Sequence, residues 1–360
     1  MHILHVVGAG ARPNLMKAAP VFHALAKQPR GQQSLIDTGQ HYDANMSGAL
    51  FPQLGIPEPD VNLGVGSGSH ARQTAEVMTH FEPIALQRKP DLVLVYGDVN
   101  STLAASLVCA KLRIPVGHVE AGLRSFDRAM PEGINRLVTD QIADLLFTPS
   151  EDGDANLLRK GIPPARIHRV GNVMIDSLVD LLPKAMTCKL NSLPERYALI
   201  TLHRPSNVDD LQTLKSILDS LLEISMELDV VFTVHPRTRQ RIAEWGLTTG
   251  ELHLLEPMPY VEFLALQRRA TVVITDSGGV QEESTYLGVP CLTLRDNTER
   301  PITVSLGTNT LVGRDRKKLN SELSNILAGK AKRGVIPPSW DGRSGERIAE
   351  IRSHRLKGSS

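Results

Sequence analysis

Residues 92–122 read LVLVYGDVNSTLAASLVCAKLRIPVGHVEAG, which contains two short apolar runs with a longer amphipathic segment between them. The runs at 92–96 and 114–119 are apolar throughout rather than alternating, which is typical of parallel strands buried on both faces. The segment 103–112 predicts a crossover helix that joins them. The same order of elements continues as far as Phe147, so we predict a doubly wound parallel α/β sheet.

Apolar runs of strand length recur in the second half of the chain. They lie at 197–202, 230–234, 271–275 and 291–294. Residues 182–194 combine two prolines with lysine and asparagine, which is typical of a linker. We therefore expect an N-terminal Rossmann-like domain at 1–172 and a C-terminal Rossmann-like domain at 173–340. Residues 341–360 are expected to form a helix or tail that can pack back on the N-terminal domain.

Composition excludes several classes of protein. Forty Lys and Arg oppose 39 Asp and Glu among 360 residues, so no bulk charge holds the chain to nucleic acid. No apolar run reaches 18 residues and no signal-like segment follows Met1, so we expect a cytoplasmic protein without a membrane partner. The three cysteines are far apart and the 12 histidines lack ligand spacing, which disfavours disulfides and metal sites.

Polar residues follow most of the predicted strands. Ligands of open parallel sheets bind beyond the carboxyl ends of the strands, so these residues are the candidates for a site. The segments are 8–13, Gly97-Asp98, Glu120-Ala121-Gly122, His203-Arg204, His235-Pro236 and 276–279.

The turn after the first strand resembles a dinucleotide fingerprint at its first positions only. Pro13 stands where the third glycine would allow close packing of helix on strand, so we exclude a nicotinamide site. Arg12 and Lys17 are two cations near a helix start, which suits phosphate oxygens. A solvated pair of surface cations is the alternative.

Residues 276–283 read DSGGVQEE and predict an anion site at a helix start. Ser277, Gly278 and Gly279 offer a hydroxyl and backbone N–H groups to a diphosphate, whereas Glu283 suits the hydroxyls of a ribose. A simple helix cap formed by Asp276 or Ser277 is the alternative. His203 and His235 are either donors to an anion or core histidines.

Three carboxylates of the first half, Asp98, Glu120 and Glu132, lie beside turns or glycines. Paired carboxylates in one site are candidates for general acid and base chemistry. Ion pairs with arginines of the same segment are the alternative explanation. Those arginines are Arg124, Arg128 and Arg136.

Several long motifs, taken in order, resemble those of the non-hydrolysing UDP-N-acetylglucosamine 2-epimerases. They are 10–13 (GARP), 38–41 (TGQH), the block 97–136 with GHVEAGLR at 117–124, 275–283, and 295–301 (RDNTERP). The resemblance implies a GT-B fold, with two Rossmann-like domains that face a central cleft. It also implies a homodimer and no cofactor.

The resemblance further assigns roles by position. Asp98, Glu120, Glu132 and His203 would be catalytic, and Glu283 would bind the ribose while Phe263 stacks on the uracil. The diphosphate group would be held by Arg12, His203, Ser277, Gly278, Gly279 and Arg300, with Lys17 and Arg136 nearby. A second UDP-N-acetylglucosamine would act as an activator bound by Gln40, Arg72, Glu132, Arg204 and His235.

The sequence departs from the family pattern in two places. Pro205 and Ser206 stand where the family often has arginine and glutamate, and Ala11 and Asn14 stand where threonine and glutamate are frequent. The implied reaction is anti elimination of UDP to 2-acetamidoglucal and re-addition with inversion at C2. Alternatives are a 2-epimerase of a UDP-diacetamido-uronic acid, a GT-B glycosyltransferase, a hydrolysing epimerase and a non-catalytic sugar-nucleotide sensor.

Overall fold

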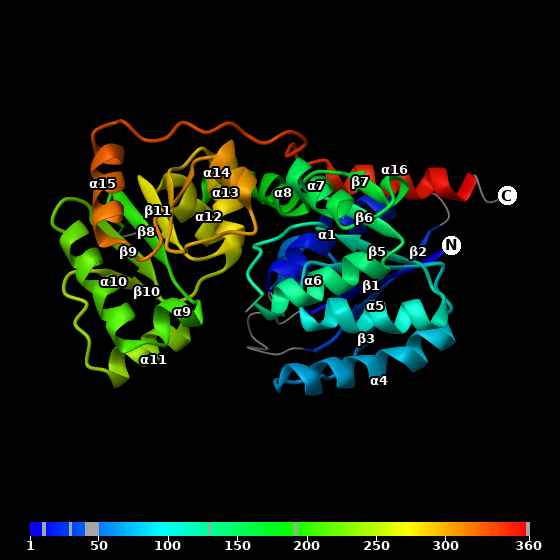
Figure 1. Ribbon diagram of the computed structural model, residues 1–360. Helices are drawn as coiled ribbons and strands as arrows, with labels where there is room; N and C mark the ends of the chain where they lie inside the picture. The colour runs from blue at the N-terminus through cyan, green and yellow to red at the C-terminus, as the bar shows by residue number, and fades with distance from the viewer. Residues whose placement is uncertain (9–11, 29–30, 40–49, 129, 191–192, 358–360) are drawn as a thin grey trace. The chain divides into compact units, whose positions relative to one another are not determined.

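The computed structural model describes residues 1–8, 12–28, 31–39, 50–128, 130–190 and 193–357. The chain forms two compact units (Figure 1). Unit 1 comprises Met1–Val179 and Pro338–Ser360, and unit 2 comprises Asp180–Pro337. Each unit has its own sheet and core, so each is described by itself.

Within its described residues, unit 1 contains a seven-stranded parallel sheet in the order β3-β2-β1-β4-β5-β6-β7. The strands are β1 (His2–Val7), β2 (Gln32–Asp37), β3 (Val61–Asn62), β4 (Leu92–Tyr96), β5 (Val116–Val119), β6 (Leu145–Thr148) and β7 (Ile167–Arg169). The chain reverses its direction of travel across the sheet between β1 and β4. The carboxyl ends of these two strands therefore border the position where such sheets bind ligands.

Helices cover both faces of this sheet. They are α1 (Arg12–Ala26), α3 (Leu50–Leu54), α4 (His70–Arg88), α5 (Asn100–Leu112), α6 (Pro131–Ile142), α7 (Glu151–Arg159), the 3₁₀ turn η1 (Pro164–Arg166), α8 (Val173–Thr187) and α16 (Ser344–Lys357). Helices α4, α5 and α6 lie side by side on one face, where Phe81, Val108 and Leu4 share a core. The last helix, α16, lies along α1 in Figure 1.

Among its described residues, unit 2 contains a six-stranded parallel sheet in the order β10-β9-β8-β11-β12-β13. The strands are β8 (Tyr197–Thr201), β9 (Asp229–Thr233), β10 (His253–Leu255), β11 (Val272–Thr275), β12 (Cys291–Thr293) and β13 (Asn309–Leu311). The helices are α9 (Pro205–Val208), α10 (Leu211–Ile224), α11 (Pro236–Glu244), α12 (Tyr260–Arg269), α13 (Gly278–Leu287), α14 (Pro301–Ser305) and α15 (Arg316–Leu327). The reversal of strand order falls between β8 and β11.

The core of unit 2 lies on both faces of its sheet, because its apolar strands alternate side chains between them. Ile200 and Phe232 pack with Leu218 of α10 on one face. Leu199 and Val273 pack with Leu266 of α12 on the other. The predicted α/β class with two doubly wound parallel sheets is thus confirmed.

Residues 182–187 are helical rather than part of the expected linker, because α8 continues through Pro183 to Thr187. Proline has no N–H, so the carbonyl group of Val179 receives no helical hydrogen bond from residue 183. The two units divide at this residue, between Val179 and Asp180.

Candidate active site

In unit 1, two of the predicted carboxylates lie side by side at the carboxyl ends of neighbouring strands. Asp98 follows β4 and Glu120 follows β5, which pair in parallel with Tyr96 opposite Val119. Arg136 of α6 joins them, since its Nη2 donates to Asp98 Oδ2 and lies 3.2 Å from Glu120 Oε1. Both interpretations of the sequence therefore apply here, because the carboxylates converge and also form ion pairs.

Lys17 lies in the same cluster. Its Nζ is 2.8 Å from Glu120 Oε2, so this buried carboxylate has a cation at each oxygen. The side chains of Lys17, Glu120 and Arg136 are 7%, 2% and 2% exposed, whereas that of Asp98 is 25% exposed. Asp98 is therefore the member of the cluster that is most open to a ligand.

The backbone of this cluster is unusual at Glu120. Its φ is +72°, in the left-handed region that non-glycine residues rarely adopt. Such a conformation costs free energy and persists where the surroundings enforce it. Gly97, just before Asp98, also has a positive φ of +64°, and a Cβ there would lie 2.8 Å from Lys17 Nζ. Both turns are thus shaped to bring Asp98 and Glu120 to Arg136.

The other predicted residues of unit 1 lie apart from these contacts. Glu132 is exposed in the first turn of α6, one helical turn before Arg136. Arg72 is exposed on α4 and donates to Glu76 at 2.7 Å. Arg12 begins α1 but its side chain lies outside the described residues, as does the whole of Gln40.

In unit 2, Asp276 is the centre of a second polar cluster at the ends of β8 and β11. Its buried carboxylate accepts from the backbone N–H of His203 and Arg204 and from Asn207 Nδ2. His203 Nδ1 lies 3.0 Å from Asp276 Oδ1. Burial alone raises the pKa of Asp276, but the His203 ring and these N–H donors outweigh it and lower the pKa.

The start of α13 is the predicted anion site, and a carboxylate side chain lies beside it. Ser277 is the N-cap, and its side chain makes no capping hydrogen bond, while the carboxylate of Asp276 points to β8 instead. A Cβ on Gly278 would lie 2.8 Å from Glu299 Oε1. A carboxylate thus lies against this helix start, where negative charge is favoured.

Arginines surround that carboxylate. Arg295 Nη2 is 2.7 Å and Arg204 Nη2 is 3.5 Å from Glu299 oxygens. Although burial raises the pKa of Glu299, the charges of Arg300 and Arg295 lower it well below its usual range. Arg300 Nε lies 2.7 Å from the buried Glu282. The predicted diphosphate residues therefore lie in a dense network of opposite charges.

Glu283 and Phe263 lie on α13 and α12. Glu283 is buried, and its Oε1 accepts a hydrogen bond of 2.8 Å from the hydroxyl of Tyr260, also on α12. Phe263 is half-buried beside the core cluster of these helices.

His203 and His235 are neighbours, with ring centroids 6.4 Å apart. His235 begins α11 as its N-cap, and its Nδ1 accepts from the N–H of Arg237 at 3.3 Å. Partial burial and the nearby charges of His203 and Arg237 lower the pKa of His235. Both side chains are exposed, which excludes the alternative of core histidines.

Sequence reasoning did not single out the partners of these residues. They are His118, Asp140, Asn207, Tyr260, Glu282 and Glu299. The motif segments contain His118, Glu282 and Glu299, but no spacing indicates that these side chains are buried with a charged partner. Tyr260 and Asp140 lie 23 and 22 residues from the side chains that they bind.

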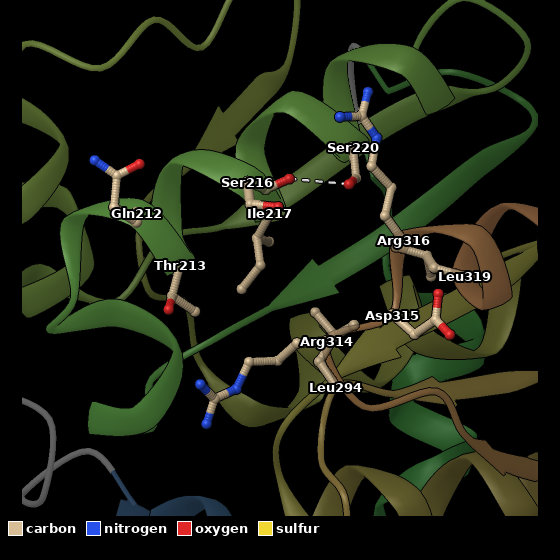
Figure 2. Close-up of a pocket in the computed structure, with 10 residues that line it drawn as sticks. All are labelled: Gln212, Thr213, Ser216, Ile217, Ser220, Leu294, Arg314, Asp315, Arg316 and Leu319. Carbon is tan, nitrogen blue, oxygen red and sulfur yellow. Dashed lines mark hydrogen bonds between the residues drawn. The ribbon is translucent and has the colours of Figure 1, made fainter.

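Figure 2 shows a pocket in unit 2 that is distinct from these clusters. It encloses about 260 Å³ between α10 and α15, and its apolar lining is Ile217, Leu294 and Leu319. Across the residues that the structure describes, no group of three His, Cys, Asp or Glu side chains is placed to hold a metal ion. None of the described helices combines the length and apolar character needed to cross a membrane.

Comparison with known proteins identifies the family. The family model for UDP-N-acetylglucosamine 2-epimerase matches residues 23–353. The UDP-N-acetylglucosamine 2-epimerase of Methanocaldococcus jannaschii is 44% identical over 356 residues, which cover 95% of this chain and 96% of that relative. The chain belongs to the UDP-N-acetylglucosamine 2-epimerase family. The resemblance predicted from the motifs is confirmed.

A solved structure and a second relative are also similar to this chain over nearly their whole length. The crystal structure of the M. jannaschii UDP-GlcNAc 2-epimerase in complex with UDP-GlcNAc and UDP has a TM-score of 0.91 and 43% identity, covering 98% of this chain and 100% of that one. The UDP-2,3-diacetamido-2,3-dideoxy-D-glucuronate 2-epimerase of Pseudomonas aeruginosa is 42% identical over 97% of this chain and 99% of that relative. The fold of the family is therefore established for this chain.

Proposed function

We propose that this chain is a UDP-N-acetylglucosamine 2-epimerase that interconverts UDP-N-acetylglucosamine and UDP-N-acetylmannosamine. The observation that carries the proposal is the convergence of Asp98 and Glu120 on Arg136, in a chain of this family. A reaction that removes a proton from one face of a carbon atom and returns one to the other face needs two such groups.

The proposed nucleotide site belongs to unit 2. Ser277, Gly278 and Gly279 at the start of α13 and the nearby Arg300 would hold the diphosphate, together with His203 and with Arg12 of unit 1. The helix N-terminus and the guanidinium group both favour phosphate oxygens, which supports this assignment. Glu283 would accept the ribose hydroxyls and Phe263 would stack on the uracil. Tyr260 supports the role of Glu283, because its hydroxyl donates to one oxygen of that carboxylate and orients it.

The proposed chemistry is elimination followed by re-addition. The hydrogen at C2 of the sugar is not flanked by a carbonyl, so direct deprotonation would have a prohibitive barrier. If a carboxylate takes the C2 proton while the C1–O bond breaks, UDP leaves with the electron pair and 2-acetamidoglucal forms. A UDP oxygen then bonds to C1 while a different acid protonates C2 on the opposite face. Asp98, Glu120 and Glu132 are the proposed acids and bases.

The cationic side chains have a separate role in the proposed reaction. Negative charge builds on the departing diphosphate, and fixed cations and N–H groups lower the barrier by stabilising it. Lys17 and Arg136 contact Glu120 directly, so they hold that carboxylate in place. Neither step consumes an oxidant, a reductant or a cofactor.

A second candidate substrate is a UDP-2,3-diacetamido uronic acid. The 42% identity to the P. aeruginosa epimerase of that sugar favours it. The segment Pro205–Val208 forms α9, in which Pro205 and Ser206 are exposed while Asn207 binds Asp276. The two exposed positions differ in charge from the common family pattern, so they are candidates for contacts that select the sugar.

We extend the proposal to a homodimer and to a regulatory site, both of which the resemblance implies. Arg72, Glu132, Arg204 and His235, with Gln40, would bind a second UDP-N-acetylglucosamine as activator. Arg204 already donates to the carbonyl of Asp276 at 3.1 Å, which would link that nucleotide to the start of α13. A sigmoidal dependence of rate on substrate would support an activator, and a hyperbolic one would contradict it.

Proton NMR with UDP-N-acetylglucosamine in D₂O and no added cofactor tests the function. The proposal expects UDP-N-acetylmannosamine with deuterium at C2, because the proton is lost to solvent during the reaction. Binding of UDP without exchange at C2 would contradict this substrate. The diacetamido uronic acid nucleotide, assayed in the same way, then distinguishes the second candidate from a binding protein.

A further inference from the structure

A buried histidine lies directly behind the two carboxylates. His118, in β5, is fully buried, and its Nε2 donates to the carbonyl oxygen of Gly97 over 2.7 Å. Gly97 is the residue before Asp98, and its own N–H donates to the carbonyl of Val119 over 3.0 Å. The turn that carries Asp98 is thus bound twice to the strand that carries Glu120.

The other side of the same ring binds a buried carboxylate. His118 Nδ1 lies 2.7 Å from Asp140 Oδ1 on α6, and Asp140 is 1% exposed. Both ring nitrogens face oxygen atoms, so the ring is held from both sides, by α6 and by the turn before Asp98. This pairing offsets part of the desolvation free energy of the buried His118 and Asp140 side chains.

Asp140 also binds the turn that carries Glu120. Its Oδ2 accepts from the N–H of Gly122 at 3.2 Å and lies 2.6 Å from Arg124 Nη2. Gly122 has a φ of +83°, and Glu120 two residues earlier has +72°. Burial raises the pKa of Asp140, but His118 and Arg124 outweigh it and lower the pKa, so the carboxylate stays ionised near neutral pH.

Helix α6 connects these contacts to the reacting groups. Arg136 precedes Asp140 by four residues, so both side chains lie on one face of the helix. Arg136 contacts the carboxylates of Asp98 and Glu120, and Asp140 contacts the backbone around Glu120 and, through His118, the backbone beside Asp98. One helix face therefore determines the position of both turns.

We infer that His118 and Asp140 are positioning residues, which fix the Asp98 and Glu120 turns relative to each other for proton transfer. The inference rests on the proposed function, because it assigns a purpose to the spacing of those two carboxylates. A displacement of about 1 Å at a reacting group can cost about 100-fold in rate. A loss of kcat with unchanged nucleotide affinity is therefore the expected signature.

The test compares three variants with a matched control. Asp140→Asn removes the ionised carboxylate, His118→Gln keeps a donor near the place of Nε2, and His118→Asn keeps one near the place of Nδ1. The control is Asp176→Asn, since Asp176 is also buried in unit 1, at 6% exposure, and accepts the N–H of Gly345 over 2.7 Å, away from both turns. The measurements are kcat, KM, the Kd of UDP and the midpoint of thermal unfolding.

We expect Asp140→Asn to lower kcat by about 100-fold with little change in KM or in the Kd of UDP. The two His118 variants should each lower kcat by about 10-fold or more, because each keeps one of the two contacts. Asp176→Asn should lower the midpoint of thermal unfolding about as much as Asp140→Asn does, but it should leave kcat near the wild-type value. Wild-type kcat in the folded Asp140 and His118 variants, or an equal loss of kcat in the control, would overturn the inference.

Amide hydrogen exchange gives a readout that is independent of turnover. In Asp140→Asn and His118→Gln, exchange at residues 97–98 and 120–124 should accelerate relative to wild type, and in Asp176→Asn it should not. Unchanged exchange in these segments would also overturn the inference. If the wild-type chain fails to exchange the C2 proton of the sugar, the proposed function fails, whereas amide exchange still decides whether this pair holds the two turns.

Discussion

At the scale of single residues, the assignment of Asp98 and Glu120 makes a prediction about catalysis. Asp98→Asn or Glu120→Gln should lower turnover by about 10²–10⁴-fold, the range of general acid and base catalysis, and leave UDP affinity unchanged. Neither carboxylate is assigned to the nucleotide. Initial rates by NMR and calorimetric titration with UDP measure the two quantities. Asp219→Asn is the control, because that partly exposed carboxylate lies on α10 of unit 2, where it pairs with Lys215 at 3.0 Å.

The opposite outcome is expected at Glu283. Glu283→Ala should weaken UDP binding by about 10- to 100-fold, since hydrogen bonds to a charged group contribute about 1.5–3 kcal/mol. Tyr260→Phe should weaken it less, because it removes the hydroxyl that orients Glu283 but keeps the carboxylate. Calorimetry with UDP measures both, with the exposed Glu262→Ala as control. Wild-type affinity in Glu283→Ala would remove that residue from the ribose.

The sequence allowed part of these clusters to be predicted. Asp98, Glu120 and His203 directly follow apolar runs, so their place at the carboxyl ends of strands could be inferred from the pattern. The partners of these residues could not, because Asp276 and His203 are 73 residues apart and meet only through the pairing of β8 with β11. Glu282 gives no signal either, since burial with Arg300 depends on the packing of α13 against α14.

At the scale of elements, long apolar strands were predictable and short polar ones were not. The predicted runs 92–96 and 271–275 contain β4 and β11, which are buried along their whole length. In contrast, β7, β10 and β13 have three residues each and include His168, His253 and Asn309. They are strands because their neighbours offer free backbone groups, a tertiary effect that local propensity does not contain.

The turn after β5 makes a prediction at this scale. A Cβ on Gly122 would lie 2.5 Å from the carbonyl oxygen of Gly153, and its φ of +83° disfavours other residues. An alanine in the left-handed region costs about 1 kcal/mol. Gly122→Ala should destabilise unit 1 by more than this, because the backbone at Gly153 must also move. Chemical denaturation followed by fluorescence measures the loss. Gly66→Ala, where the structure has open space, is the control and should be nearly neutral.

At the scale of the whole molecule, the two units should differ in their sensitivity to acid. His5 of unit 1 is fully buried between Tyr96 and Gln33, and burial lowers its pKa from 6.5 to about 4. The folded state therefore binds fewer protons than the unfolded state between these values. Its contribution to stability is complete above pH 6.5 and is lost as the pH falls toward 4, a loss of about 3 kcal/mol.

Unit 2 should lose less stability than unit 1 as the pH falls from 6.5 to about 4.5. Its buried carboxylates Asp276 and Glu299 have lowered pKa values, because His203 and the surrounding arginines outweigh burial. The stability that they contribute is present above their ordinary values of 3.8 and 4.5 and is lost only as the pH falls below them. Between pH 6.5 and about 4.5, unit 1 should therefore weaken more than unit 2, whose His235 also has a lowered pKa but is exposed.

The two tryptophans of the chain can test this difference, since each unit contains one. Trp340 is buried in unit 1, where its Nε1 donates to the carbonyl of Pro149, and Trp245 ends α11 in unit 2. In Trp245→Phe, denaturation followed by Trp340 fluorescence should shift to lower urea as the pH falls from 6.5 to 4.5. In Trp340→Phe, the Trp245 signal should shift less over this range.

His5→Gln isolates the histidine from the other titrating groups of unit 1. Burial raises the pKa of Asp176, so that residue favours the folded state more at acidic pH and acts against His5. Because His5→Gln leaves Asp176 in place, the difference in unfolding free energy between variant and parent should shrink as the pH falls from 6.5 toward 4. A difference that stays constant over this range would show that His5 titrates alike in the folded and unfolded chains, and the acid sensitivity of unit 1 would need another source.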